Sequence, residues 1–190
     1  MLIQSDYNKV ISKVSVDVNN SKIESSDHVR NLGVIFDNGM TMSAQISALC
    51  KSLYFQIRKI GTIRNFLTED VTKTLVTSLI LSKMDYCNSL FAGLPNNALN
   101  PLQIVQNNAA RLIFRRRKSD HVTPLLRDLH WLPVNERIEY KMSVLCFKCL
   151  NCLAPEYLNT LRTYKPSGDL RSAKDKTKCI EPLYAYKKYG

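Results

Sequence analysis

The sequence predicts a mainly α protein: a helical bundle with a small antiparallel β element at its N-terminus and a loose C-terminal tail. Apolar and polar residues alternate over the first part of the chain, as they do in strands. From Thr41 the apolar residues recur every three or four positions, as on one face of a helix. After Lys165 this period disappears and Pro, Gly, Ser and Lys dominate. We therefore divide the chain into a short β element at 1–40, a helical region at 41–164 and a basic flexible tail at 165–190.

The N-terminal segment is expected to form two or three short antiparallel strands. Residues alternate in VSVDV at 14–18, the turn signal Asn-Asn-Ser follows at 19–21, and Lys-Ile-Glu at 22–24 can form the returning strand. The run VRNLGVIFD at 29–37 is rich in β-branched residues. An Asn-Gly pair comes directly after it and should end the β element there.

The apolar spacing predicts a first helix from Thr41 to Gly61, a residue that should end or bend it. A second helix should begin after Thr68, because its hydroxyl is a favourable N-cap. Glu69 and Asp70 then lie in the first turn, where the helix dipole favours acidic groups. The buried stripe of this second helix is expected to consist of Val71, Leu75 and Leu79, with Ser82 as a further candidate.

A third helix should follow the Gly-Leu-Pro loop at 93–95, with Pro101 in its first turn, because proline lacks the backbone N–H that later turns need. It should end in the basic run at 115–118, where cations suit the helix C-terminus. Further helices are expected at 124–129 and 135–151, and a short one opening at Pro155. The apolar side of the third helix is expected to consist of Leu99, Leu102, Val105, Ala109 and Leu112.

The bulk composition favours an anionic partner. The 190 residues carry a formal net charge of +11, with an isoelectric point of about 9.5, and a surplus of this size suits nucleic acid or an acidic membrane face. No apolar run approaches the roughly 20 residues that a membrane span needs, so we expect no membrane partner. The N-terminal sequence lacks the basic start and apolar core of a signal peptide. We therefore expect an intracellular protein, in the nucleus or cytoplasm, with reduced cysteines.

Five segments of the sequence match the motifs of one family. They are VRNLGVIFDNGMTM at 29–42, DYCNSLFAGLP at 85–95, LQIVQNNAARLI at 102–113, HVTPLLRDLHWLPVNERIEYK at 121–141, and LN with LAPEYL within 150–158. The chain resembles the reverse transcriptases of non-LTR retrotransposons, of the jockey-like and chicken-repeat-like kind, in which such segments occur in the same order and at similar spacing. The resemblance covers nearly the entire chain.

The resemblance implies that the chain is the thumb and connection of an RNA-directed DNA polymerase, with the β element at 1–40 following a missing palm. Such a piece would help to grip a duplex in target-primed reverse transcription. The expected partners are RNA or an RNA–DNA hybrid, and the missing fingers and palm. The family's catalytic Tyr-x-Asp-Asp motif does not occur in the sequence, so we expect no enzymatic activity and no cofactor from the chain alone. The alternative is a non-catalytic helical interaction or structural protein, or a decayed retroelement fragment.

No catalytic residue is assigned. Polymerases of this kind cluster carboxylates around two metal ions, whereas only Glu69 and Asp70 are adjacent here. Asp85 is the strongest candidate for a catalytic carboxylate, but we favour a structural role for it, as a cap or a hydrogen-bond partner at a helix end. His130 and Trp131 could stack on a base; we favour Trp131 as the anchor of the turn before the next helix.

Three closely spaced cysteines are candidate ligands of a zinc site. Cys146, Cys149 and Cys152 are spaced by three, which on a helix places them on one slowly drifting face, and His121 or His130 could supply a fourth ligand. The surrounding run is apolar, and buried cysteine packs as a small hydrophobe. We favour packing and assign no metal site.

The densest basic cluster is the predicted binding surface. Together with cations of the first helix it could line a face that contacts phosphates, although charge runs are often only solvated helix ends. The sequence does not show whether the two groups share one face. The predicted nucleic-acid-binding residues are Lys51, Arg58, Lys59, Arg64, Arg111, Arg115, Arg116, Arg117 and Lys118.

Overall fold

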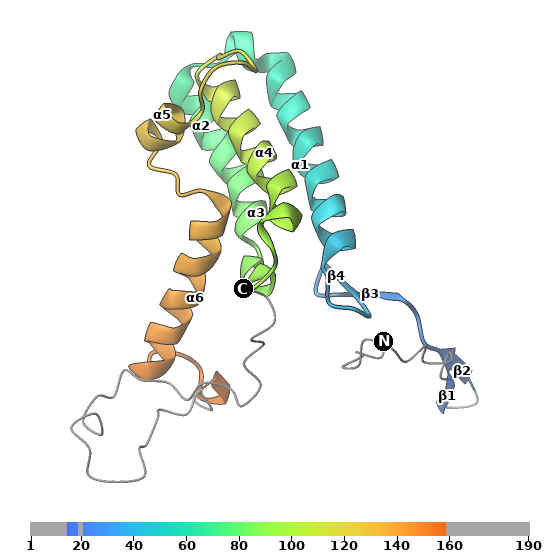
Figure 1. The fold of residues 1–190 in the computed structure, drawn as a ribbon. Helices are drawn as coiled ribbons and strands as arrows, with labels where there is room; N and C mark the ends of the chain where they lie inside the picture. Colours follow the sequence, from blue (N-terminus) through green and yellow to red (C-terminus); the bar gives the residue numbers. More distant parts are fainter. Residues whose placement is uncertain (1–14, 19–20, 159–190) are drawn as a thin grey trace, which may run out of the picture. The chain divides into compact units, whose positions relative to one another are not determined.

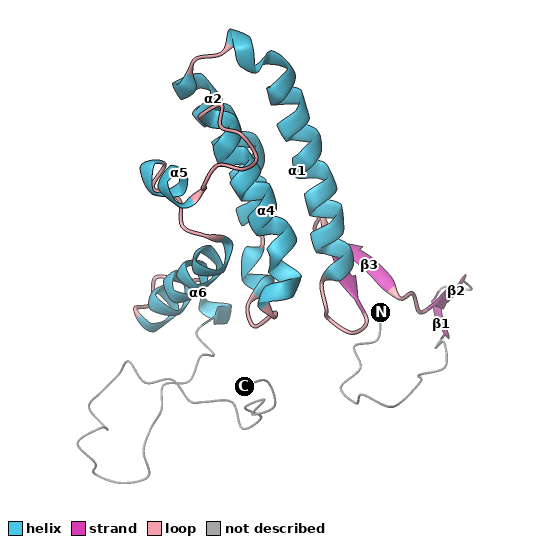
Figure 2. Ribbon diagram, turned by 45° about the horizontal axis from the view of Figure 1, so that its top comes forward, coloured by secondary structure: helices cyan, strands magenta, loops and turns pink. Residues whose placement is uncertain are grey.

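The computed structural model describes residues 15–18 and 21–158, so the tail predicted at 165–190 lies outside the described residues. Within the described part helices dominate and strands occur only near the N-terminus, which confirms the predicted fold class (Figure 2). The chain divides into two compact units, residues 1–139 and 140–190. No helix among the described residues has the length and apolar character that a membrane span requires.

In the described part of the chain, four short strands form two separate antiparallel hairpins. Strand β1 (Ser15–Val18) pairs with β2 (Ser21–Glu24), and β3 (His28–Asn31) pairs with β4 (Val34–Asp37). The sequence predicted two or three strands, which was wrong because the run at 29–37 was read as one strand. Its central Leu-Gly pair, with φ values of 47° and 85°, reverses the chain instead.

The second hairpin is tied to the first helix by Asp37. Its carboxylate accepts hydrogen bonds from the backbone N–H and hydroxyl of Thr41, at 2.8 and 2.7 Å, and from the backbone N–H of Met42 at 2.7 Å. Burial raises the pKa of Asp37, but these hydrogen bonds outweigh burial and hold the pKa below its usual value. Helix α1 (Ser43–Ile63) begins directly afterwards. Gly61 lies in its last turn and does not end it.

The helices of the first unit form a bundle in which α1 and α4 (Asn96–Ile113) run parallel, with the helix at 69–85 antiparallel to both (Figure 1). Tyr54 of α1 lies beside Asn108 of α4, with 3.4 Å between the hydroxyl and the amide nitrogen, and Arg64 lies beside Leu112. Both helices therefore end at the same end of the bundle. Fully burying one aliphatic side chain contributes roughly 1.5–3 kcal/mol to the stability of the fold. Central members of the core are Leu53, Ile60, Val76, Ile80, Leu102, Val105 and Ile113.

The second long helix is interrupted by a π turn. It consists of α2 (Glu69–Val76), the π turn η2 (Thr77–Leu81) and α3 (Ser82–Asp85). The predicted N-cap is confirmed, because the hydroxyl of Thr68 accepts a hydrogen bond from the backbone N–H of Val71 at 3.4 Å. The 3-10 turn η1 (Arg64–Phe66) joins this helix to α1.

The predicted buried stripe of this helix was wrong. Val71 and Leu79 are 47% and 42% exposed, Ser82 is exposed and Leu75 is only half-buried. Thr72 can occupy the buried face because its hydroxyl donates to the carbonyl of Thr68 at 2.7 Å, which satisfies its polar atom locally. The residues that face the core are Thr72, Val76, Ile80, Leu81 and Met84.

Helix α4 confirms its predicted apolar side, with Leu112 half-buried and the other four residues buried. Two predictions about its ends were wrong. Pro101 lies in the second turn rather than the first. Because proline has no backbone N–H, the carbonyl of Asn97 loses its hydrogen-bond partner within the helix. Both residues are exposed, so water can hydrogen-bond to this carbonyl instead. The helix also ends at Ile113, before the basic run.

The remaining elements follow the predictions closely. Helix α5 spans Thr123–Asp128, and α6 spans Val134–Leu150. The 3-10 turn η3 (Asn88–Phe91) precedes the loop before α4, and η4 (Glu156–Leu158) follows Pro155. Helix α6 begins in the first unit and continues into the second.

Candidate nucleic-acid interface

Arg64 is a structural residue at the junction of three elements. Its side chain is only 7% exposed, and its guanidinium donates to the carbonyls of Leu112 (2.9 Å), Ile113 (2.5 Å) and Leu67 (2.8 Å). The last carbonyls of α4 thereby gain the partners that a helix C-terminus lacks. Burial lowers the pKa of Arg64, and the neighbouring charge of Arg115 lowers it further, but arginine stays protonated at neutral pH. This predicted binding residue therefore faces the protein interior.

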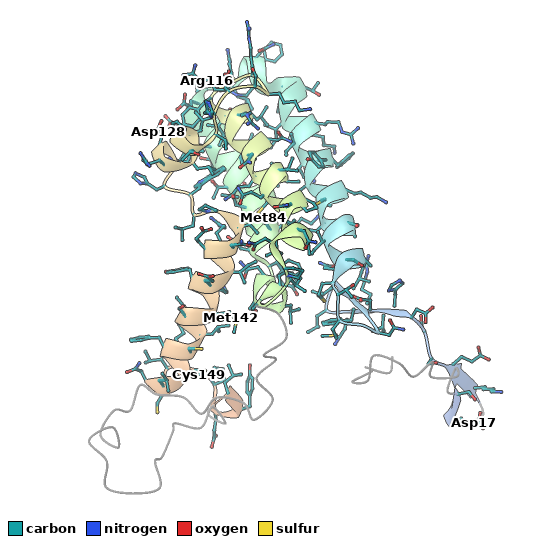
Figure 3. The ribbon with its side chains drawn as sticks, in the orientation of Figure 1. Asp17, Met84, Arg116, Asp128, Met142 and Cys149 are labelled. Carbon is teal, nitrogen blue, oxygen red and sulfur yellow. The ribbon has the colours of Figure 1, made fainter. Side chains whose placement is uncertain are left out.

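The basic run forms a turn directly after α4, which we call the basic turn, residues 115–118. Arg115 adopts a left-handed backbone with φ 51°, and its guanidinium donates to the carbonyl of Arg64 at 3.1 Å. The turn continues with a hydrogen bond from the backbone N–H of Arg117 to the carboxylate of Asp120, at 3.0 Å. The side chains of Arg116, Arg117 and Lys118 are exposed, and Figure 3 shows Arg116 at the end of the bundle.

Arg111 supports this turn from within α4. Its guanidinium donates to the backbone carbonyl of Asp120, at 3.3 Å from Nε and 3.0 Å from Nη2, and the residue is half-buried. The backbone carbonyl of Arg111 also accepts from the N–H of Arg116 at 3.0 Å. Arg111 thus orders the loop that presents the basic turn.

Two cations of α1 lie at the same end of the bundle. Arg58 and Lys59 are exposed near the helix C-terminus, and the Lys59 ammonium lies 4.6 Å from the ring centroid of Phe55. Lys51 is also exposed but lies about 12 Å further down the helix, at 1.5 Å per residue. We call Arg58, Lys59 and the basic turn together the basic end. Exposed Glu69 and Asp70 at the start of α2 partly offset its charge.

An aromatic residue that was not predicted to be exposed also lies at this end. Phe66, the last residue of η1, is 88% exposed, and Ile63 before it is 46% exposed. An apolar residue between two helices is expected to pack in the core, so the sequence carried no signal that Phe66 faces solvent. Leu67, its neighbour, packs against the core instead.

Asp85 has the structural role that we favoured. Its carboxylate forms an ion pair with Arg137 of α6 through both oxygens, with 2.9 Å between Nε and Oδ1, and it accepts from the amide of Asn88 at 3.5 Å. Across residues 15–18 and 21–158, no group of three or more His, Cys, Asp or Glu side chains is arranged to hold a metal ion.

The three clustered cysteines do not share one helical face. Cys146 and Cys149 belong to α6, but that helix ends at Leu150, and Cys152 lies beyond it with φ 55°. Cys149 is buried and Cys152 is exposed. The expectation of a common face was wrong because Cys152 lies beyond the helix end, where its left-handed backbone takes the chain off the helical path; the absence of zinc stays a prediction.

Trp131 anchors the turn before α6, as we favoured. Its backbone N–H donates to the carbonyl of Leu126 at 2.8 Å, and its half-buried side chain packs against the core. His130 is exposed with φ 55°, a backbone conformation that reverses the chain at this point.

In comparisons with protein-family models, with curated proteins and with solved structures, no match to this chain was found.

Proposed function

We propose that the chain is the thumb-and-connection part of a non-LTR retrotransposon reverse transcriptase, without the catalytic palm, and that it binds RNA or an RNA–DNA hybrid through phosphates at the basic end. The five sequence segments support the family. The observation that carries the binding proposal is the convergence of the basic turn with Arg58 and Lys59 where α1 and α4 both end.

Exposure and hydrogen bonding support a division of the predicted cations into those available to a ligand and those engaged within the fold. The guanidiniums of Arg64 and Arg111 are engaged with backbone carbonyls. Exposed, flexible cations suit phosphates, which fix position on the strand but carry little base information. The residues that we assign to phosphate contact are Arg58, Lys59, Arg116, Arg117 and Lys118, with Arg115 as a link between the turn and η1.

The salt dependence of binding tests the proposal. Each phosphate that is neutralised contributes about 0.9 to the slope of log affinity against log salt on duplex DNA. Replacing Arg116, Arg117 and Lys118 together with Ala should lower the slope by up to about 2.7. Affinity should fall alike for unrelated hybrid sequences.

A control triple variant removes the same charge elsewhere. Lys22, Arg30 and Lys83 are exposed cations in β2, β3 and α3, and their replacement with Ala should leave the slope unchanged. A basic-turn variant that folds and keeps the parent slope would refute phosphate binding at the basic end. Equal losses in both variants would show that net charge alone attracts the nucleic acid.

The alternative of a helical interaction protein rests on the second unit. Four of its apolar side chains are strongly exposed: Tyr140 (63%), Phe147 (60%), Leu153 (67%) and Tyr157 (75%). Contiguous exposed apolar surface marks interaction sites, and Tyr140 and Phe147, seven residues apart in α6, lie on the same face of that helix. If the chain binds no nucleic acid at low salt, this alternative becomes the leading one.

A further inference from the structure

Phe66 is an exposed aromatic ring on an ordered support. It is 88% exposed, although transfer of such a ring out of water is favourable by roughly 1.5–3 kcal/mol. The backbone beneath it is fixed, since Arg64, two residues earlier, donates to three carbonyls, and the N–H of Leu67 donates to the carbonyl of Arg64 at 3.3 Å. The ring is therefore held out by its surroundings rather than left on a frayed terminus.

The ring also lies beside the basic end. The carbonyl of Arg64 accepts a hydrogen bond from the guanidinium of Arg115 at 3.1 Å, and two residues of chain span at most about 7 Å. The backbone of Phe66 therefore lies within about 10 Å of the Arg115 guanidinium. Surfaces that bind single strands combine cations for the phosphates with aromatic rings on which unpaired bases stack. Inside a base-paired duplex both faces of each base are covered by neighbouring pairs, whereas an unpaired base leaves a face free for such a ring.

We propose that Phe66 stacks on an unpaired base next to the duplex, so that the basic end prefers a hybrid with a single-stranded overhang to a blunt hybrid. This inference rests on the proposed function, because the phosphates of the same nucleic acid contact the basic turn. The exposed cations of the basic end outnumber the exposed Glu69 and Asp70 that follow the ring in sequence. The net charge of the surroundings therefore favours a nucleic acid over an apolar protein segment as the partner of the ring.

Binding of the full chain to two fluorescent hybrids, one blunt and one with a short overhang, tests the proposal. Stacking on one base contributes about 1–3 kcal/mol, which corresponds to between about 5-fold and about 150-fold in affinity. Phe66→Ala should weaken binding of the overhang hybrid by this factor and leave the blunt hybrid unaffected. Phe66→Trp should keep the preference. The fluorescence of a 2-aminopurine at the first overhang position should change on binding of the parent chain and not on binding of Phe66→Ala.

Tyr86→Ala is the matched control, since this ring is 55% exposed in the same unit and its hydroxyl donates to the carbonyl of Leu32 in the second hairpin, at the opposite end of α1. Its replacement should leave the preference intact. Equal affinity of the parent chain for both hybrids, or an unchanged preference in Phe66→Ala, would overturn the stacking proposal. In that event a steep salt slope, lowered by the basic-turn variant, would still support the proposed function, whereas absence of binding to either hybrid would refute both.

Discussion

Two charged side chains in the described part of the chain are buried, and neither forms a hydrogen bond to a group of opposite charge. Both are hydrogen-bonded mainly to backbone groups instead. Asp37 is 5% exposed and accepts from two backbone N–H groups and one hydroxyl; Arg64 is 7% exposed and donates to three carbonyls. Buried charge is tolerated only when its hydrogen-bonding capacity is used. These two residues therefore fix the two ends of α1.

Arg64→Ala should lower the free energy of unfolding by about 3 kcal/mol, because it leaves carbonyls at the end of α4 without partners. Arg64→Lys should restore little, since one ammonium cannot reproduce a fork of donors. Denaturant unfolding of the chain measures the loss. The exposed Arg116→Ala serves as the control and should change stability by no more than about 0.5 kcal/mol. Equal stability of Arg64→Ala and the parent would show that these hydrogen bonds contribute nothing net.

Asp37 should make stability depend on pH in the acid range. Its hydrogen bonds lower the pKa in the folded state, so the charged form stabilises the fold above the unfolded pKa of about 3.9. This contribution is lost as the pH falls through the lower, folded pKa. Asp37→Ala should therefore be less stable than the parent by about 2 kcal/mol at neutral pH. The difference should shrink below about pH 4; a constant difference across the acid range would contradict the assignment.

The ion pair between Asp85 and Arg137 joins α3 to the start of α6. The side chains are 35% and 19% exposed, so solvent screens the pair only in part. A double-mutant cycle with Asp85→Ala and Arg137→Ala should give a coupling of about 1–2 kcal/mol. Thermal or denaturant unfolding of the two single variants and the double variant supplies the four free energies. Additive losses would mean that the two residues stabilise the fold independently.

The sequence predicted which elements exist better than which side they bury. Period and capping located every long helix of the described chain, because amphipathic spacing and the Thr68 cap are local signals. The buried side of the helix at 69–85 was missed, since that segment is apolar on more than one side and a polar Thr72 bonds its own turn. The strand count failed where the Leu-Gly turn lies inside an apolar run.

The candidate site was predictable in composition and not in geometry. The charge pattern identified the cations, but side-chain burial depends on which carbonyls lie nearby in the folded chain. Arg64 and Arg111 therefore looked the same in the sequence as exposed Arg116. That the basic turn and the end of α1 meet depends on α1 and α4 being parallel, which is a tertiary property. The exposure of Phe66 likewise follows from the junction and not from its neighbours in sequence.

For the whole molecule, we expect no primer extension by the purified chain on an RNA template with any divalent metal. Polymerase chemistry requires clustered carboxylates that hold two metal ions, and the described residues contain no such cluster. Extension above a control without protein that survives repurification would show that the chain has its own catalytic centre. Primer extension that occurs only after a separate palm domain is added would support the proposal that this chain is the thumb-and-connection part of a polymerase.

The π turn η2 inserts one extra residue into the helix at 69–85, compared with a regular α-helix. The core-facing residues Val76, Ile80, Leu81 and Met84 are spaced by four, one and three positions. With one residue removed from the turn, the spacing becomes three, one and three, which is the regular apolar pattern of an α-helix.

Deletion of the exposed Ser78 should therefore keep both halves of the helix in register and cost little stability in thermal unfolding. The same deletion at Ile104, inside the regular α4, would rotate everything after it by about 100° and should unfold the chain. The length of this one helix is thus open to change by a single codon, whereas the length of its neighbour is not.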